Sequence, residues 1–211
     1  MFHDRRDAGE RLATRLTGYR DVRPLVLALP RGGVPVAVPV ARALAAPLDL
    51  LLVRKIGVPW HPELAMGAVV DGARPQVVWN PTVMTQAALT SAEREPLVAR
   101  ELAELERRRQ VYRGARTPPA IGGRTVIVVD DGIATGTTMR AALEALRRQM
   151  PAALVLAVPV AAAEALALLR PLVDDVVCLE TPRDFLGVSQ VYDSFPQLTD
   201  AEVTALLAAF G

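Results

Sequence analysis

The stretch that decides the fold is Val126-Ile127-Val128-Val129-Asp130-Asp131-Gly132-Ile133-Ala134-Thr135-Gly136-Thr137-Thr138. Four β-branched apolar residues run into two carboxylates and a loop of small residues, and a helical pattern begins near Met139. This order predicts a buried strand, a polar loop and the start of a helix. Ligands of open parallel α/β sheets bind just outside the carboxyl ends of the strands, so we expect a binding site at this loop.

The two halves of the loop suit different chemical groups. Small residues at a helix N-terminus leave backbone N–H groups free beside the positive end of the helix dipole, and this arrangement binds phosphate. The carboxylates of Asp130 and Asp131 repel phosphate but accept hydrogen bonds from ribose hydroxyls. The loop is therefore expected to hold a phosphorylated sugar at two ends. For Asp130-Asp131-Gly132 alone, the alternative is an ordinary solvated turn.

The same stretch resembles the signature of the type I phosphoribosyltransferase family, in which a hydrophobic strand runs into two acids and a Thr/Gly loop. The resemblance implies that Asp130 and Asp131 bind the ribose hydroxyls of phosphoribosyl pyrophosphate (PRPP). It also implies a binding loop for the ribose phosphate of PRPP, which consists of Gly132, Ala134, Thr135, Gly136, Thr137 and Thr138.

Along the whole chain, apolar strand patterns alternate with helical patterns. This alternation predicts one α/β domain over residues 1–211 with a doubly wound, mainly parallel sheet. We expect the core at about 20–180, and a small C-terminal hood and helix over 181–211. Expected helices cover 4–18, 34–45, 93–112, 137–149, 161–169 and 199–209. Expected strands cover 25–29, 48–53, 65–70, 75–79, 124–131, 153–158 and 175–179.

Net charge, cysteine count and the lengths of the apolar segments exclude several classes of protein. The net charge of +1 gives no global attraction to nucleic acid or to a membrane. The single cysteine, Cys178, excludes an intramolecular disulfide framework and fits a reducing compartment. The apolar segments 34–53 and 151–169 are interrupted by prolines and charges, so neither is expected to span a membrane. The first residues do not have the pattern of a signal peptide, and we expect a cytoplasmic protein.

A second loop, Pro30-Arg31-Gly32-Gly33, follows the first predicted strand. Glycines let the backbone approach an oxyanion closely, and Arg31 offers a two-pronged donor. The loop resembles the pyrophosphate loop of the family, which implies that Arg31, Gly32 and Gly33 bind that group. On its own, the same tetrapeptide also makes an ordinary turn.

A third segment, residues 54–64, is rich in breakers and comes after the second predicted strand. The resemblance implies a mobile loop here that closes over pyrophosphate, with Arg54 and Lys55 meeting its charge. A solvated lysine is the alternative for Lys55. For His61 and Glu63 a functional role and a surface position are equally expected.

The implied chemistry needs little covalent help. Displacing pyrophosphate from C1 of the ribose passes through an oxocarbenium-like state, so the protein must hold the sugar, neutralise the leaving group and exclude water. We expect catalysis to depend on Asp130, Asp131, Lys55 and Arg31. Mg²⁺ is expected as the cofactor, held mainly through PRPP without a direct protein ligand.

The resemblance implies a nitrogenous acceptor, and a nucleobase is the class that we expect. Phe185 and Tyr192 in the hood are candidates for stacking on a planar base, and the alternative is that they fill a small core under a loop. Ala134 stands where the hypoxanthine-guanine branch usually has an aspartate. This substitution disfavours a 6-oxopurine and leaves the acceptor open.

A rival function is a PRPP-sensing regulator that binds nucleic acid or a protein partner without catalysis. Its candidate surface is a basic cluster that consists of Arg107, Arg108, Arg109, Arg113 and Arg116. Glutamates interleave with these arginines, so an ordinary solvated helix face is the alternative, and we expect no nucleic-acid partner. The family resemblance favours a homodimer.

Overall fold

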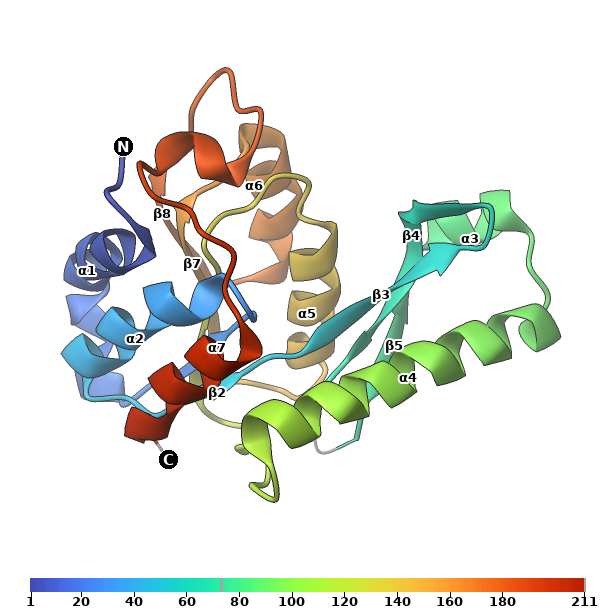
Figure 1. The fold of residues 1–211 in the computed structure, drawn as a ribbon, viewed down its shortest axis with the longest axis horizontal. Helices are drawn as coiled ribbons and strands as arrows, with labels where there is room; N and C mark the ends of the chain where they lie inside the picture. Colours follow the sequence, from blue (N-terminus) through green and yellow to red (C-terminus); the bar gives the residue numbers. More distant parts are fainter. Residues whose placement is uncertain (73, 211) are drawn as a thin grey trace.

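The centre of the fold is a five-stranded parallel sheet with the order β2-β1-β6-β7-β8 (Figure 1). The structure, a computed structural model, describes residues 1–72 and 74–210, with the side chain of Glu63 outside the described part. The strands are β1 (Leu25–Ala28), β2 (Leu48–Leu50), β6 (Thr125–Val129), β7 (Ala153–Val160) and β8 (Asp175–Glu180).

Helices cover both faces of this sheet (Figure 1). One face carries α1 (Arg5–Arg15) and α2 (Gly33–Leu44), and the other carries α5 (Thr137–Arg147) and α6 (Ala163–Leu169). Along β6, Ile127 and Val129 pack with the first pair of helices, and Val126 and Val128 pack with the second. Both faces of the strand are buried, which explains its continuous apolar run. The doubly wound, mainly parallel sheet is confirmed.

The direction in which successive strands are added to the sheet changes between β1 and β6. From β1 the chain passes through α2 to β2 on one side, whereas β6 pairs with β1 on the other side. Ala28 lies in register with Val129, so the loops that follow these two strands start side by side. A reversal of this kind opens a crevice at the carboxyl edge of a parallel sheet, and it brings the two predicted loops together.

A second, antiparallel sheet extends from the core together with two helices, and we call residues 53–113 the arm (Figure 1). It contains β3 (Val53–Val58), β4 (His61–Val70), β5 (Gln76–Trp79), α3 (Pro81–Ala87) and α4 (Ser91–Arg113). The strand pair predicted at 65–70 and 75–79 is confirmed. The loop predicted at 54–64 is wrong, because β3 and β4 pair as a hairpin with its turn at Pro59 and Trp60.

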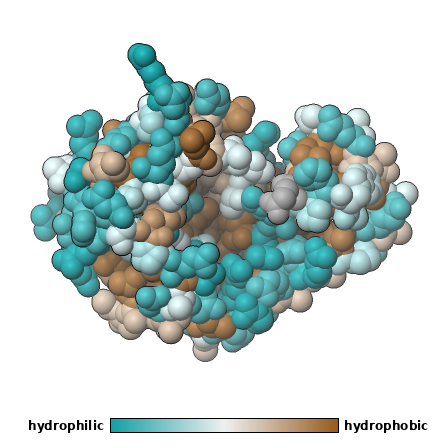
Figure 2. All heavy atoms as spheres, turned by 45° about the horizontal axis from the view of Figure 1, so that its top comes forward, coloured by the Kyte–Doolittle hydropathy of each residue, from teal (hydrophilic) through white to brown (hydrophobic). Residues whose placement is uncertain are grey.

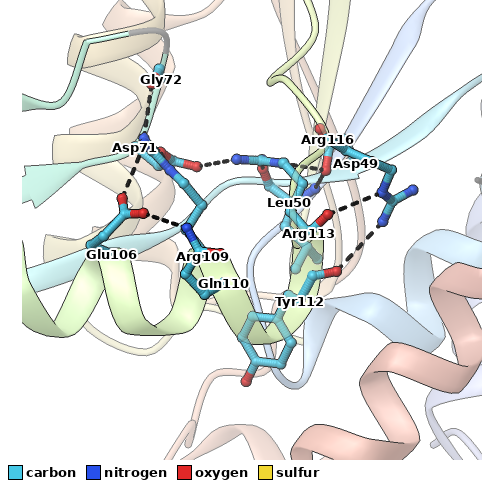
Figure 3. A network of polar contacts seen from close by, with 10 residues as sticks. All are labelled: Asp49, Leu50, Asp71, Gly72, Glu106, Arg109, Gln110, Tyr112, Arg113 and Arg116. Carbon is cyan, nitrogen blue, oxygen red and sulfur yellow. Dashed lines mark hydrogen bonds and ion pairs between the residues drawn. The ribbon is translucent and has the colours of Figure 1, made fainter.

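A buried polar network fastens the arm to the core (Figure 3). Arg113 on α4 donates to Asp71 over 2.7 Å and to the carbonyl oxygen of Leu50 over 3.0 Å. It also forms an ion pair with Asp49 at 3.3 Å. Arg109 donates to Asp71 from the preceding turn of the helix. The side chains of Arg113 and Asp71 are 3% and 2% exposed, so this pairing is shielded from solvent.

The C-terminal part crosses the carboxyl edge of the sheet and then ends in α7 (Asp200–Leu207), which packs on α2 and α4. Thr199 and Glu202 form a capping box at its start. Short 3₁₀ turns occupy Thr17–Val22, Arg170–Leu172, Val188–Val191 and Ala208–Phe210. The helix predicted at 4–18 is shorter in the structure, where α1 ends at Arg15. Helix α3 was not predicted from the sequence. No helix in the described residues is long and apolar enough to cross a membrane.

Candidate active site at the carboxyl edge

The loop after β6 is held at its middle by the neighbouring strand. The N–H of Ile133 donates to Val160 over 3.0 Å, and the carbonyl of Ile133 accepts from Ala162 over 2.9 Å. Gly136 then turns the chain into α5 with a φ of 74°, a conformation that favours glycine. These anchors leave Ala134 and Thr135 exposed at the surface of the loop.

A hollow of about 200 Å³ opens over this loop and is lined by Asp130, residues 132–139 and Val188. Figure 2 shows the wider surface hollowed between the body of the molecule and the arm. No side chain of the described residues caps the start of α5. The first N–H groups of the helix therefore point toward the hollow with the positive end of the helix dipole behind them, which suits a phosphate.

The two carboxylates lie in different surroundings. Oδ1 of Asp130 accepts from the N–H of Asp131 over 2.9 Å, and Oδ2 of Asp131 accepts from Nε of Arg5 over 2.8 Å. Burial, and then repulsion from Asp131, raise the pKa of Asp130 well above its ordinary value. Burial also raises the pKa of Asp131, and Arg5 opposes that rise. Within the described residues, Asp131 is the member of the pair that forms an ion pair with Arg5.

The loop after β1 packs directly on these acids. A Cβ atom at Gly32 would lie 2.0 Å from Oδ2 of Asp131, and one at Gly33 would lie 2.7 Å from the carbonyl oxygen of Val129. At Gly33 the nearest atom is backbone, so a side chain there would push the two loops apart, whereas at Gly32 it would displace the Asp131 carboxylate. Arg31 extends from the same loop and donates to the carbonyl of Leu198 in the C-terminal part.

Neighbouring cations on β3 point to opposite faces of the antiparallel sheet. Lys55 lines a pocket with Thr137 and Arg140 of α5, on the side of the signature loop. Arg54 forms an ion pair with Glu101 of α4 at 2.9 Å, on the other side. Alternation of side chains along a strand explains the difference. The guanidinium of Arg54 thus contacts α4, which is itself part of the arm, and its predicted contact with pyrophosphate stays a prediction.

A family model described as the phosphoribosyl transferase domain matches residues 3–194, which include both loops and the arm. This chain belongs to that family.

The chain is also similar to a solved structure and to two curated proteins. The solved structure of TT1426 from Thermus thermophilus is 42% identical with a TM-score of 0.87, and the match covers 100% of this chain and 99% of that one. "Putative phosphoribosyl transferase Rv0571c" of Mycobacterium tuberculosis H37Rv is 45% identical over 208 residues, and so is its counterpart MT0597 of strain CDC 1551. These matches cover 98% of this chain and 46% of each relative, so the chain spans about half the length of the curated proteins.

The aromatic residues predicted for base stacking occupy different places in this phosphoribosyl transferase domain. Tyr192 is buried, with its ring centroid 5.5 Å from that of Phe2 and 5.0 Å from that of Phe195. Its hydroxyl donates to the carbonyl oxygen of Asp131 over 2.6 Å. This burial favours the alternative that Tyr192 fills a small core under a loop, and its stacking on a base stays a prediction. Phe185 is half-buried beside the same cluster, and its role stays a prediction.

The basic cluster of the rival regulator is largely neutralised within the domain. Arg107 and Arg108 pair with Glu104 at 2.8 Å and 2.9 Å, and these bonds lower the pKa of Glu104 to about 2. Arg109 and Arg113 are engaged by the buried network around Asp71. Arg116 donates to backbone carbonyls of α4. Each of these arginines thus has a partner within the described residues, and the regulator alternative stays a prediction.

Two further positions differ from expectation. His61 lies exposed at the start of β4, and the side chain of Glu63 lies outside the described residues, so neither receives a role. Arg5 on α1 contacts Asp131 but was not identified from the sequence, because no local motif surrounds it.

The donors around the hollow suit phosphate better than a bare cation. Backbone N–H groups and threonine hydroxyls line the loop, and the part of the chain that the structure describes contains no cluster of three or more His, Cys, Asp or Glu residues arranged to hold a metal. Mg²⁺ commonly keeps several waters and binds through substrate phosphates. The residues present thus fit an ion carried by a diphosphate.

Proposed function

We propose that this phosphoribosyl transferase domain moves phosphoribose from PRPP to a nitrogenous acceptor, such as a nucleobase, with release of pyrophosphate. The observation that carries the proposal is the contact between the loops after β1 and β6, next to the hollow that the second loop lines. The glycine pair after β1 contacts the carboxylates after β6, and the uncapped start of α5 lies next to them. This arrangement offers separate sites for a sugar, its phosphate and a second anion.

Each part of the donor has a complementary group. The ribose phosphate would bind Thr135, Gly136, Thr137 and Thr138 at the start of α5, with Gly132 and Ala134 completing the loop. The ribose hydroxyls would donate to Asp130 and Asp131. Pyrophosphate would lie against Arg31, Gly32 and Gly33, and Lys55 would reach it from the arm.

The reaction breaks the bond between C1 and the pyrophosphate oxygen and forms a bond between C1 and the acceptor nitrogen. The electron pair leaves with pyrophosphate, and the acceptor proton passes to it or to solvent. The chain contributes by orienting the sugar and by stabilising charge that develops at C1 and on the leaving group. When bound, Mg²⁺ supplies neutralising charge to the diphosphate.

Two measurements test the proposal. Calorimetry with PRPP and Mg²⁺ should show binding that is lost in the double variant Asp130→Asn/Asp131→Asn, with unchanged circular dichroism. A panel of bases and amines should include one that elicits pyrophosphate release. PRPP binding without turnover on any acceptor would favour the sensor alternative, and no PRPP binding by the wild type would refute the donor assignment.

The oligomeric state is proposed only from the resemblance. A homodimer would sediment at about twice the 22.6 kDa of the chain. Sedimentation at the monomer mass would remove this expectation without affecting the proposed chemistry.

A further inference from the structure

One buried arginine close to the candidate site has no part in the proposed chemistry. Arg5 lies in the first turn of α1, and its side chain is 9% exposed. Its Nε donates to Oδ2 of Asp131 over 2.8 Å, and its Nη1 donates to the carbonyl of Pro196 over 2.8 Å. Its Cζ atom lies 3.6 Å from the ring centroid of Phe195. A single guanidinium thus joins the signature loop to the C-terminal hood.

The carboxylate of Asp131 is fixed from several sides. The charged and titratable groups that face it are Arg5 from α1, Asp130 from its own loop and Tyr192 from the hood. Tyr192 donates to the backbone carbonyl of Asp131, and the backbone of Gly32 packs against the carboxylate. Arg5 is the only cation among these groups, within the described residues, that forms an ion pair with Asp131.

We propose that Arg5 is a positioning residue: it holds the Asp131 carboxylate ionised and in one orientation for the ribose hydroxyls, and it makes that orientation depend on the seating of the hood at residues 195–196. This inference rests on the proposed function, because it assumes that Asp131 binds ribose. Arg5 itself does not contact the hollow in which the donor would lie.

The chemistry of arginine explains why this residue type stands here. Its planar fork directs one N–H at a carboxylate and another at a carbonyl while the face of the group rests on an aromatic ring. Lysine would keep the charge but would not satisfy these three partners together. Without a cation, burial and the adjacent Asp130 would favour protonation of Asp131, and a protonated carboxyl accepts hydrogen bonds from hydroxyls less well.

The test compares Arg5→Met and Arg5→Lys with the matched control Arg11→Met. Arg11 lies on the same helix and also pairs with a carboxylate, Asp7 at 2.8 Å, and an aromatic ring, that of Phe2 at 5.3 Å. It has no contact with Asp131. Circular dichroism and thermal melting first establish that each variant is folded.

PRPP binding is then measured by calorimetry in two buffers of different ionisation enthalpy, which reports the protons released on binding. Arg5→Met should bind PRPP at least about tenfold more weakly at pH 7. It should also release more protons, because Asp131 must lose its proton before it binds ribose. Arg5→Lys should keep the proton release of the wild type and lose part of the affinity. Arg11→Met should match the wild type in both quantities.

Wild-type affinity and proton release in Arg5→Met would overturn the role of Arg5 and leave the proposed function intact. Equal losses of affinity in Arg5→Met and Arg11→Met, with unchanged proton release, would also overturn the role of Arg5. A general disturbance of α1 would then explain the loss of affinity. If Arg5→Met does not fold, wild-type binding by the folded Arg5→Lys variant has the same meaning. No PRPP binding by the wild type would instead refute the proposed function.

Discussion

Gly32 and Asp131 are in direct contact: a Cβ atom at position 32 would lie 2.0 Å from Oδ2 of the carboxylate. The loops after β1 and β6 are therefore interlocked, with no space for a side chain between them. The same Oδ2 atom accepts a hydrogen bond from Arg5, so a side chain at position 32 that displaced this atom would also disturb the ion pair between Asp131 and Arg5.

Substituting Gly32→Ala should therefore disturb binding more than folding. The added methyl group would push against the end of a side chain, which can rotate, and rotation would break the bond to Arg5. We expect PRPP affinity to fall at least about tenfold, measured by calorimetry, while the melting temperature changes by only about 2 °C. Gly18→Ala is the control, since open space surrounds that position. Wild-type affinity in Gly32→Ala would show that Asp131 does not need its present orientation.

Gly33→Ala should reduce the stability of the fold more than Gly32→Ala does. Its Cβ atom would meet the carbonyl oxygen of Val129 at 2.7 Å, which is backbone of β6 and moves only with the sheet. Such overpacking costs about 1–3 kcal/mol of unfolding free energy. Urea denaturation would measure the loss, and a midpoint equal to that of the wild type would contradict the close packing of the two loops.

Asp130→Asn should stabilise the fold and remove function. The pKa of Asp130 is raised in the folded state, so ionisation of this carboxyl opposes folding. Its contribution is therefore most favourable below the ordinary carboxyl pKa and is lost as the pH rises from there toward the raised value. An asparagine keeps the acceptor for the N–H of Asp131 and carries no charge.

Thermal melting at pH 4 and pH 8 checks this prediction. The variant and the wild type should melt at similar temperatures at the lower pH, and the variant should melt at the higher temperature at pH 8, with PRPP affinity lost. A variant that is less stable at pH 8 would mean that the charge of Asp130 is compensated in the fold.

The opposite orientations of Arg54 and Lys55 predict different defects. Arg54→Met should lower the unfolding free energy by about 1–3 kcal/mol, because it leaves the Glu101 carboxylate, which is 6% exposed, with one cation fewer. Its PRPP affinity should not change. Lys55→Met should leave stability unchanged and weaken binding or turnover. Urea denaturation measures the stability of both variants, and calorimetry measures their PRPP affinity. A loss of affinity in Arg54→Met and a loss of stability in Lys55→Met would contradict the roles assigned to the two side chains.

The parts of the fold that were predicted correctly are those whose signals are local. Residues 126–138 contain the strand, the acids, the loop and the helix start in one continuous run, so their order alone predicted the local structure. The arm was harder to predict, because the polar pair Arg54-Lys55 and the breaker Pro59 suggested a loop. Hairpin pairing depends on the partner strand, whose residue Ala68 lies opposite Lys55.

The contacts of individual side chains could not be predicted for the same reason. Arg54 is 47 residues from its partner Glu101, and Tyr192 is buried by Phe2 at the other end of the chain. Neither contact has a sequence signature. The contacts of Arg5 have no sequence signature either. Its partners Asp131, Phe195 and Pro196 come from the signature loop and the C-terminal part, and they lie near one another only after folding.

The contact between Arg5 and Pro196 joins residues that are 191 positions apart in the sequence. During synthesis the last strand of the parallel sheet is complete at Glu180, before residue 196 has emerged. Contacts of such long sequence separation form late, because their loop-closure entropy is only offset once the intervening structure exists. A nascent chain would therefore gain its sheet first and the fixed carboxylate of Asp131 last, so that the ability to bind a ligand would mark the completion of folding.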